Sequence, residues 1–379
     1  GWRGIGRDGV VEDFIPPERW PDMLSKVWQQ NIGLGDASPV LVSNKLFLLV
    51  KQEDNEVTLC LDAKTGNQVW KAVNNVAPEV TGPPSSHPGP RSTPCVAQDK
   101  VYTLGVGGAL TCLDAQTGKI IWKNNEYTEV PQFYVGMSPL VINNKCIVHL
   151  GGRETGVIAA FNAGSGEKIW TIEGEPPTYS SPVTMTIGDE NVLIVQSETD
   201  LIGVSMDGNV LFKIPTPVER RFYNASTPVI DGQNIIIAGQ GLGTKSYKIQ
   251  KSGNNYSFSE NWINPDFGVS FNTPVIKNGY IYGHEARLGK LFCLDASTGG
   301  TSWADSTAHN RFASLLILDN YLLSLDATAT LSVLEVNQDQ YIQKAAYKIA
   351  DTDIYAHPLV VGNMIYVKDK EMITCWETR

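Results

Sequence analysis

The chain has 379 residues, of which 42% are hydrophobic, so it is long enough to bury a large core. No apolar run approaches the ~20 residues of a membrane span, and we expect no transmembrane segment. A net charge of −10 argues against nucleic acid as a partner.

A short motif returns at intervals of about 45 residues, the period of a repeat array. It is Ser-Pro or Thr-Pro, or a degenerate form, and its prolines are Pro39, Pro94, Pro139, Pro182, Pro228, Pro274 and Pro358. Ser314-Leu315 fills an eighth place without a proline. Short runs of Val, Ile, Leu and Tyr broken by turn residues follow each copy, which indicates strands rather than helices.

A second motif, Asp-Ala-x-Thr-Gly, is clearest at 114–118 and returns at 62–66, 162–166 and 295–299, with weaker forms at Asp207-Gly208 and Ser252-Gly253. An aromatic residue follows the glycine; the set is Trp70, Trp122, Trp170, Phe212, Trp262 and Trp303. We expect this motif to form the last hairpin of each unit, because glycine accepts positive φ and the aspartate can accept bonds from nearby amides.

The first hairpin of each unit is predicted at a pair of turn residues that mostly tolerates positive φ. These pairs are Ser43-Asn44, Gln98-Asp99, Asn143-Asn144, Gly188-Asp189, Asp231-Gly232, Asn278-Gly279, Asp319-Asn320 and Gly362-Asn363. Four antiparallel strands repeated radially form a β-propeller. The sequence therefore predicts an all-β, eight-bladed propeller; seven blades is the alternative, because the unit around 314–347 is degenerate.

The last unit offers strands near 358–361, 364–368 and 372–377 and then stops one strand short. The missing outer strand is predicted near the other terminus, at 26–30, where it includes Trp28. Pairing the two ends in one blade removes an open sheet edge. We expect an N-terminal lead-in over 1–23 and a single propeller domain over 24–379.

The motif Cys112-Leu113-Asp114-Ala115-Gln116-Thr117-Gly118-Lys119-Ile120-Ile121-Trp122 resembles the tryptophan-docking repeat of the pyrroloquinoline quinone (PQQ)-like propellers. That superfamily includes eight-bladed quinoprotein alcohol dehydrogenases and a non-catalytic lipoprotein of outer-membrane barrel assembly. The opening Gly1–Gly9 also looks like the lead-in of secreted bacterial members. The resemblance implies a periplasmic or extracellular protein, and an anchor removed upstream of Gly1 is compatible with it.

Four of the six cysteines, Cys60, Cys112, Cys293 and Cys375, share one place, two residues before the aspartate of the second motif or its equivalent. Ala160 holds that place in the third unit, so we expect a slot for a small buried side chain. Equivalent slots in different blades are too far apart for a disulfide, which needs Cα atoms within about 7 Å. Whether Cys95 and Cys146 form a disulfide stays open.

Loops between strands two and three, and between blades, share one face of the propeller and carry most of the chemically interesting residues. Loops on a rigid scaffold often bind ligands. The candidate ligand-binding residues are Arg91, Arg153, Tyr179, Arg221, Tyr223, His284, Arg287, His309, Arg311, Tyr355 and His357. The longest loop, 78–90, would be a flap over the funnel or a cover for a blade edge.

Two interpretations of these residues remain open. The arginines would form a basic collar that suits carboxylates or phosphates, with tyrosines stacking on flat rings or sugars; alternatively, each arginine pairs with an acidic neighbour to bridge two blades. A metal site at His284, Glu285, His309 and His357 has no fixed ligand spacing behind it. Histidines bonded to neighbouring backbone are the simpler expectation, and no metal ligand is predicted.

The favoured function is a ligand- or protein-binding scaffold that uses this funnel face for a small anionic or sugar-like ligand or for a protein partner. The alternative is a PQQ- and calcium-dependent quinoprotein dehydrogenase acting on an alcohol or sugar, with Glu198, Asp200 or Glu285 as base or calcium ligands. The larger members of that class carry two adjacent cysteines at the cofactor, and this chain has no such pair. A polysaccharide hydrolase or lyase is a third possibility.

Overall fold

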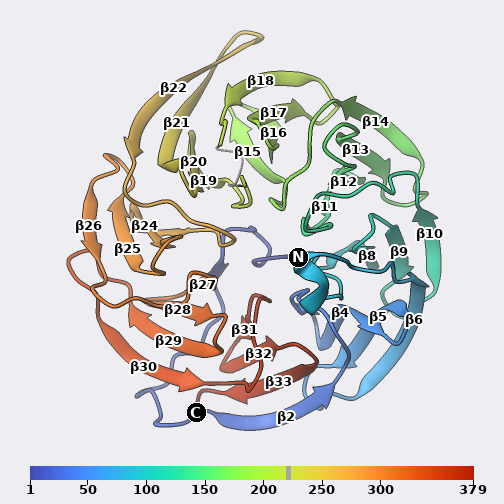
Figure 1. Cartoon of the computed structure of the whole chain (residues 1–379), viewed down its shortest axis with the longest axis vertical. Helices are drawn as coiled ribbons and strands as arrows, with labels where there is room; N and C mark the ends of the chain where they lie inside the picture. Colours follow the sequence, from blue (N-terminus) through green and yellow to red (C-terminus); the bar gives the residue numbers. More distant parts are fainter. Residues whose placement is uncertain (219–222) are drawn as a thin grey trace.

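Strands of the computed structural model, which describes residues 1–218 and 223–379, follow the predicted repeat. The described residues form eight four-stranded antiparallel blades arranged radially around a central axis (Figure 1). The one helical element among them is the 3-10 turn η1, Pro83–Ser86. Within the same residues, no helix has the length and apolar character needed to cross a membrane.

The first four blades run in chain order from the innermost strand outward. Blade 1 is β3 (Val40–Val42), β4 (Lys45–Gln52), β5 (Asn55–Asp62) and β6 (Gln68–Val76); blade 2 is β7 (Cys95–Ala97), β8 (Lys100–Leu104), β9 (Leu110–Asp114) and β10 (Ile120–Asn124). Blade 3 is β11 (Leu140–Ile142), β12 (Lys145–Leu150), β13 (Val157–Asn162) and β14 (Lys168–Glu173); blade 4 is β15 (Val183–Ile187), β16 (Glu190–Gln196), β17 (Asp200–Ser205) and β18 (Val210–Pro215).

The next three blades repeat this plan. Blade 5 is β19 (Val229–Asp231), β20 (Asn234–Gly239), β21 (Gly243–Ser252) and β22 (Asn255–Asn264); blade 6 is β23 (Val275–Lys277), β24 (Tyr280–His284), β25 (Leu291–Asp295) and β26 (Thr301–Ala304). Blade 7 is β27 (Ala313–Leu318), β28 (Tyr321–Asp326), β29 (Thr330–Glu335) and β30 (Gln343–Lys348), and the short β1 (Val10–Val11) pairs with β27 in parallel. The degenerate unit is therefore a complete blade, and eight is the correct count.

Blade 8 joins the two ends of the chain, as the sequence predicts. It consists of β31 (Leu359–Val361), β32 (Met364–Lys368), β33 (Met372–Glu377) and, as outer strand, β2 (Ser25–Asn31). Trp28 lies opposite Cys375 in the β2–β33 ladder. Figure 1 shows β2 and β33 side by side at the rim, while the N-terminus lies near the centre of the ring.

The hairpin turns have the predicted backbone. Each of the eight first-hairpin pairs contains a residue with positive φ, from Ser43 at 55° to Gly362 at 58°. In the second motif, Asp114 Oδ1 accepts bonds from the amide nitrogens of Gln116 and Thr117 and from the Thr117 hydroxyl. Gly118 takes a φ of 73°. The two motifs of each unit thus fix the two hairpins that open on the same face.

Tryptophans on the outer strands of six blades dock each of these blades onto the next one. Their indole Nε1 atoms donate to backbone carbonyl oxygens of the following blade at 2.8–3.2 Å; the pairs are Trp28–Ala63, Trp70–Ala115, Trp122–Ala163, Trp170–Met206, Trp262–Ala296 and Trp303–Asn337. A buried indole needs such an acceptor for its N–H. Each bond joins two blades, so the docking stabilises the ring as a whole.

The shared cysteine slot lies across the strand pair from the docking aromatic residue. Cys112 is opposite Trp122, Cys60 is opposite Trp70 and Ala160 is opposite Trp170. The large indole explains why this slot holds a small side chain. All six cysteines are buried free thiols, which confirms the expectation for the four equivalent ones and leaves Cys95 and Cys146 unpaired as well.

The Ser/Thr-Pro motif forms a second set of bonds between blades, around the central axis. The residue before each proline slot gives what we call the hydroxyl ring: Ser38, Thr93, Ser138, Ser181, Thr227, Thr273 and Ser314, with His357 in the eighth place. Five of its amide nitrogens donate to the side-chain oxygen of the next member at 3.0–3.1 Å, starting with Ser38 to Thr93. His357 N donates to Ser38 Oγ at 2.8 Å.

Candidate functional site

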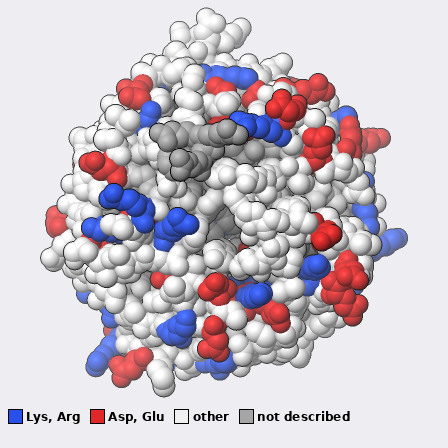
Figure 2. Space-filling model, viewed as in Figure 1, with Lys and Arg blue, Asp and Glu red and all other residues white. Residues whose placement is uncertain are grey.

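A cavity of about 390 Å³ lies where the eight blades meet. The residues three places before each proline slot all line it, and we call them the cavity ring: Asp36, Arg91, Gly136, Tyr179, Ala225, Phe271, Phe312 and Tyr355. The repeat puts one residue of every blade at the same height around the axis. Figure 2 shows the resulting hollow at the centre of this face, with Lys and Arg (blue) and Asp and Glu (red) of the described residues scattered around it.

One half of the cavity ring is aromatic. Phe271 lies 5.8 Å from Phe312 and 6.1 Å from Tyr179, and Phe312 lies 5.8 Å from Tyr355, as measured between ring centroids. The blades with the small residues Gly136 and Ala225 supply Phe133 and Tyr223 instead, which contact each other at 5.3 Å. Phe271 and Tyr355 remain 44% and 40% exposed, so their rings are available to a ligand.

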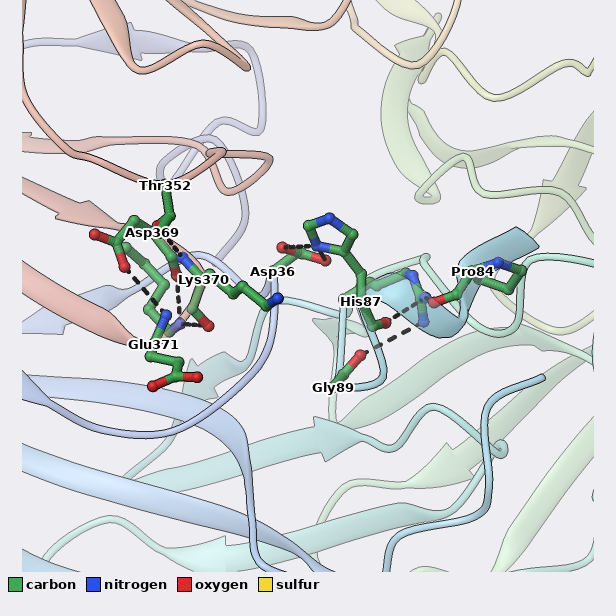
Figure 3. A network of polar contacts seen from close by, with 10 residues as sticks. Asp36, Pro84, His87, Gly89, Thr352, Asp369, Lys370 and Glu371 are labelled. Atoms are coloured by element: carbon green, nitrogen blue, oxygen red, sulfur yellow. Dashed lines mark hydrogen bonds and ion pairs between the residues drawn. The ribbon is translucent and has the colours of Figure 1, made fainter. Parts of the chain in front are cut away.

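The other side of the cavity is polar and lies under the flap. Pro83, Pro84 and His87 of the flap line the cavity, so this loop lies against the funnel. His87 Nδ1 is 3.2 Å from the Asp36 carboxylate. Figure 3 shows this pair with Pro84 and Gly89 on one side and Asp369, Lys370 and Glu371 of blade 8 on the other.

Arg91 uses its guanidinium to hold the flap. It donates to the carbonyl oxygens of His87 at 2.7 Å and of Pro84 and Gly89 at 3.5 Å. Burial lowers the pKa of Arg91 from its usual value. The one Lys or Arg side chain that lines the cavity among the described residues is therefore already engaged with backbone acceptors.

Two polar atoms deeper in the cavity lack partners within the described structure. Asn272 Oδ1 and His357 Nδ1 are buried, and no protein donor or acceptor reaches them. Asn272 and His357 are 2% and 8% exposed. Burial, followed by the charge of Arg3, lowers the pKa of His357 to about 3, so its imidazole is neutral near pH 7. Unpaired buried polar atoms are costly, and a ligand that supplies their partners would recover that free energy.

Six of the predicted ligand-binding residues reach this site or its rim. Arg91, Tyr179, Tyr355 and His357 line the cavity. Tyr223 lies against Phe133, Tyr179 and Phe271, and the Arg311 guanidinium lies 4.9 Å from the centre of the Phe312 ring.

The remaining predicted residues are engaged away from the cavity lining. Arg153 forms an ion pair with Glu198 at 2.9 Å, and Asp200 accepts a bond from the Thr199 hydroxyl at 2.6 Å. Glu285 caps its own loop by accepting the amides of Arg287 and Leu288. The described arginines therefore do not gather into the collar, because a shared face does not fix how far a loop residue lies from the axis.

The histidine pair of blade 6 lies outside the cavity lining too. His284 and His309 have ring centroids 6.0 Å apart, and His309 Nε2 lies 2.5 Å from the Asp305 carboxylate. Burial, and then the nearby His309, lower the pKa of His284 to about 3. Arg287 is exposed on the surface. Arg221 lies outside the described residues.

The residues expected for PQQ and calcium do not assemble in the described structure. Glu198, Asp200 and Glu285 are engaged as above, and no three His, Cys, Asp or Glu side chains of the described residues gather as a metal site. Asp36, the one carboxylate that lines the cavity in the described part of the chain, pairs with His87. A tricarboxylate would need several free cations, and Arg91 is held by the flap. The donor set that the described residues supply does not fit this cofactor.

Trp2, Asp36 and Phe133 are among the cavity residues that the sequence prediction missed. Asp36 had a usable signal, because it stands three places before Pro39, as Tyr179 stands before Pro182. Aligning the units on their prolines would have given the whole cavity ring. Trp2 had none, since it lies before the first repeat.

Comparison with known proteins places this geometry among related chains. A family model described as outer membrane protein assembly factor BamB matches residues 53–305, which is more than half of the chain. A quinohemoprotein alcohol dehydrogenase, ADH IIB, of Pseudomonas putida is 31% identical over 124 residues, which cover 31% of this chain and 18% of that protein. Subunit 1 of the cytochrome c methanol dehydrogenase of Methylorubrum extorquens is 23% identical over 278 residues, 68% of this chain and 41% of that one.

Solved structures share the fold at low identity. BamB from Moraxella catarrhalis superposes with a TM-score of 0.67 at 15% identity, covering 94% of this chain and 98% of that chain. Quinohemoprotein alcohol dehydrogenase from Comamonas testosteroni gives 0.66 at 14% identity, covering 94% and 77%. The matches to both curated dehydrogenases span less than half of their lengths.

Proposed function

Because the chain belongs to the PQQ-like β-propeller family, whose matching model is described as BamB, we propose that it is a binding propeller of the cell envelope or the extracellular space whose funnel takes a short neutral carbohydrate. The observation that carries the proposal is a cavity in which a cluster of aromatic side chains lies beside polar groups, including the unpaired amide oxygen of Asn272. A sugar ring has an apolar C–H face and hydroxyl donors around its edge. The aromatic side chains and the polar groups match these two features.

Charge decides between a neutral and an anionic ligand. Arg91 is bonded to three flap carbonyls, Arg153 to Glu198, and Arg311 lies over Phe312. In contrast, Asn272 Oδ1 and the Asp36 carboxylate are acceptors, which hydroxyl groups can satisfy. The lining thus favours a ligand rich in neutral donors over the anionic ligand that an arginine collar would hold.

The size of the cavity sets the length of the sugar. A volume of about 390 Å³ falls in the range of small-molecule sites, which is roughly 300–1,000 Å³. One or two sugar rings fill such a space, and a longer chain would extend past Phe271 and Tyr355 at the open side.

A quinoprotein dehydrogenase receives less support. The relatives that carry this name match the chain over a minor part of their own length. The cavity lacks a free cationic cluster and a group of carboxylates among its described lining residues. The names of these relatives therefore support shared ancestry and fold more than a shared reaction.

The test is calorimetric titration with cellobiose, maltose and N,N′-diacetylchitobiose, alongside digalacturonic acid and PQQ with Ca²⁺. We expect saturable heat with at least one neutral disaccharide. Phe271→Ala should weaken that binding by about 1–2 kcal/mol, that is roughly five- to thirty-fold, as for truncation of an aromatic contact.

Phe258→Ala is the matched control, because Phe258 is 43% exposed on β22 while Phe271 is 44% exposed in the cavity. The control should bind like the unchanged protein. Tight binding of PQQ with Ca²⁺ and of no neutral sugar would favour the dehydrogenase instead. Equal loss of binding in both phenylalanine variants would mean that the effect is not specific to the cavity.

A further inference from the structure

The lead-in contacts the inner edges of the blades near the propeller axis, with Arg3 and Arg7 buried and Ile5 in solvent. Arg3 and Arg7 are 4% and 7% exposed, although neither forms an ion pair in the described structure. Arg7 donates to the carbonyl oxygens of Ser138, Pro139 and Pro182, and Arg3 donates to that of Pro274 at 2.7 Å. The innermost strand of each blade is an edge strand with free backbone acceptors. The two guanidinium groups satisfy some of these acceptors across blades 3, 4 and 6.

The backbone of the lead-in is shaped for this path. Gly4 and Gly9 have φ values of 91° and 78°, which favour glycine. A Cβ at Gly9 would lie 2.9 Å from Val275 Cγ1 in blade 6, so the segment passes close to the inner strands. Val10 and Val11 then pair with Ile317 and Leu318 of blade 7. The lead-in is thereby held by its two buried arginines and by the pairing of β1 with β27.

This anchoring brings Trp2 into the cavity. Trp2 lines it, and its ring lies 5.3 Å from His357 at an interplanar angle of 79°. The Arg3 guanidinium lies 5.4 Å from the centre of the Trp2 ring. Six other tryptophans donate their indole N–H to a neighbouring blade. Trp2 is half-buried and, like Trp20 and Trp376, makes no such bond within the described residues.

We propose that Trp2 is a ligand-contacting and specificity-determining residue, so that the lead-in forms part of the carbohydrate site rather than only holding the inner strands together. This inference rests on the proposed function. The indole offers a flat face for a sugar ring and an N–H for a hydroxyl oxygen, beside His357 and in the same cavity as the unpaired oxygen of Asn272. A ring stacked on Trp2 would bring its hydroxyls to those two residues.

The experiment uses the full chain labelled with 5-fluorotryptophan, whose ¹⁹F spectrum reports each of the nine tryptophans. Trp2→Phe assigns the Trp2 resonance. On saturation with the disaccharide bound in the calorimetric panel (cellobiose, maltose or N,N′-diacetylchitobiose), we expect the Trp2 resonance to shift and the resonances of Trp28, Trp70 and Trp122 to stay in place. Those three lie between blades and away from the lining.

Affinities of variants give the second measurement. Trp2→Ala should weaken binding at least about tenfold, as for loss of an aromatic hot spot, and Trp2→Phe should restore most of it. Ile5→Ala is the control within the same segment, because Ile5 is fully exposed to solvent, and it should bind normally. If Trp2→Ala fails to fold, the ¹⁹F shift and Trp2→Phe decide the question.

The outcomes separate this inference from the proposed function. Sugar binding that Phe271→Ala weakens, with an unmoved Trp2 resonance and an unaffected Trp2→Ala variant, would overturn the role of Trp2 alone. Binding of no disaccharide to the unchanged protein would overturn the carbohydrate function and this inference together.

Discussion

The indole Nε1 of Trp122 in blade 2 lies 3.1 Å from the carbonyl oxygen of Ala163 in blade 3. The same indole covers Gly166, whose Cβ position would be only 2.6 Å from the ring atom Cδ2. The tryptophan and the glycine of successive motif copies are thus one contact, repeated around the propeller. This contact explains why both residues return with the same period.

Trp122→Ala should destabilise the protein strongly. The indole is 8% exposed, and its loss removes a buried aromatic side chain together with the bond to Ala163. We expect a loss of about 3–5 kcal/mol in the free energy of unfolding, as for other buried large aromatics. Urea titration followed by circular dichroism measures it, and an unchanged midpoint would contradict the docking role.

Gly166→Ala tests the other half of the contact. It imposes a side chain at a φ of 77° and against the Trp122 ring. Gly253 is the matched control, with a φ of 60° and no atom within 4 Å of its Cβ position. Gly253→Ala should cost only the backbone strain, about 1–2 kcal/mol. Gly166→Ala should cost about 1–3 kcal/mol more, the usual effect of overpacking; equal midpoints would mean that the indole moves freely.

The fold could be predicted from these motifs because each position in them requires a particular type of residue. Trp122 needs an aromatic side chain, Gly118 a positive φ, and Ser138 a hydroxyl, so the repeat is visible in the sequence. The path of the lead-in was not predictable in the same way. Arg3 and Arg7 bind backbone carbonyls, which every residue has, and therefore no partner in the sequence marks their position.

The candidate site was predicted in part for a related reason. The order of the strands in each unit predicted which face of the propeller carries the longer loops. Tyr179, Tyr355 and His357, which were expected on that face, line the cavity. The distance of each loop residue from the axis depends on how the loop folds back. Arg153 and Glu285 therefore lie away from the lining although they share the face.

The stability lost when one hydroxyl of the hydroxyl ring is removed should depend on its position in the ring. Ser138 Oγ accepts the amide of Thr93 at 3.0 Å in a buried setting, so Ser138→Ala leaves that amide without a partner. We expect a loss of about 1–3 kcal/mol. Ser314 accepts no amide from a neighbouring blade among the described residues, and Ser314→Ala should change the unfolding midpoint much less. A larger effect at Ser314 would show that the ring is not the source of the stability.

Arg7→Ala should destabilise the protein although Arg7 forms no ion pair among the described residues. It removes the donors of the Ser138, Pro139 and Pro182 carbonyl oxygens, and unsatisfied buried acceptors cost about 1–3 kcal/mol. Arg287→Ala, at an exposed arginine of blade 6, should stay within about 0.5 kcal/mol. Thermal unfolding of the two variants side by side measures the difference, and equal stabilities would mean that the lead-in does not hold the inner strands together.

Because His149 is buried, we expect the protein to lose stability in mild acid. Its imidazole is 2% exposed and bonded at 2.8 Å to the Glu175 carbonyl oxygen, and burial lowers its pKa to about 4 from the ordinary 6.5. Between these two values the unfolded chain binds more protons than the folded one, so stability rises with pH across this window and is lost as pH falls. Each such group contributes up to about 1.4 kcal/mol per pH unit. His284 and His357, whose pKa values burial lowers to about 3, act in the same direction.

His149→Gln isolates this contribution, because glutamine can donate to the same carbonyl oxygen and does not titrate. Urea midpoints measured at pH 7.5, 6.0 and 5.0 should fall less steeply in the variant than in the unchanged protein. Above pH 7, His149 is neutral in both the folded and the unfolded chain. The change of the urea midpoint with pH should therefore be nearly the same for the two proteins in that range. A parallel decline of both proteins from pH 6 to 5 would mean that His149 is charged in the folded state, and would contradict its burial on strand β12 of blade 3.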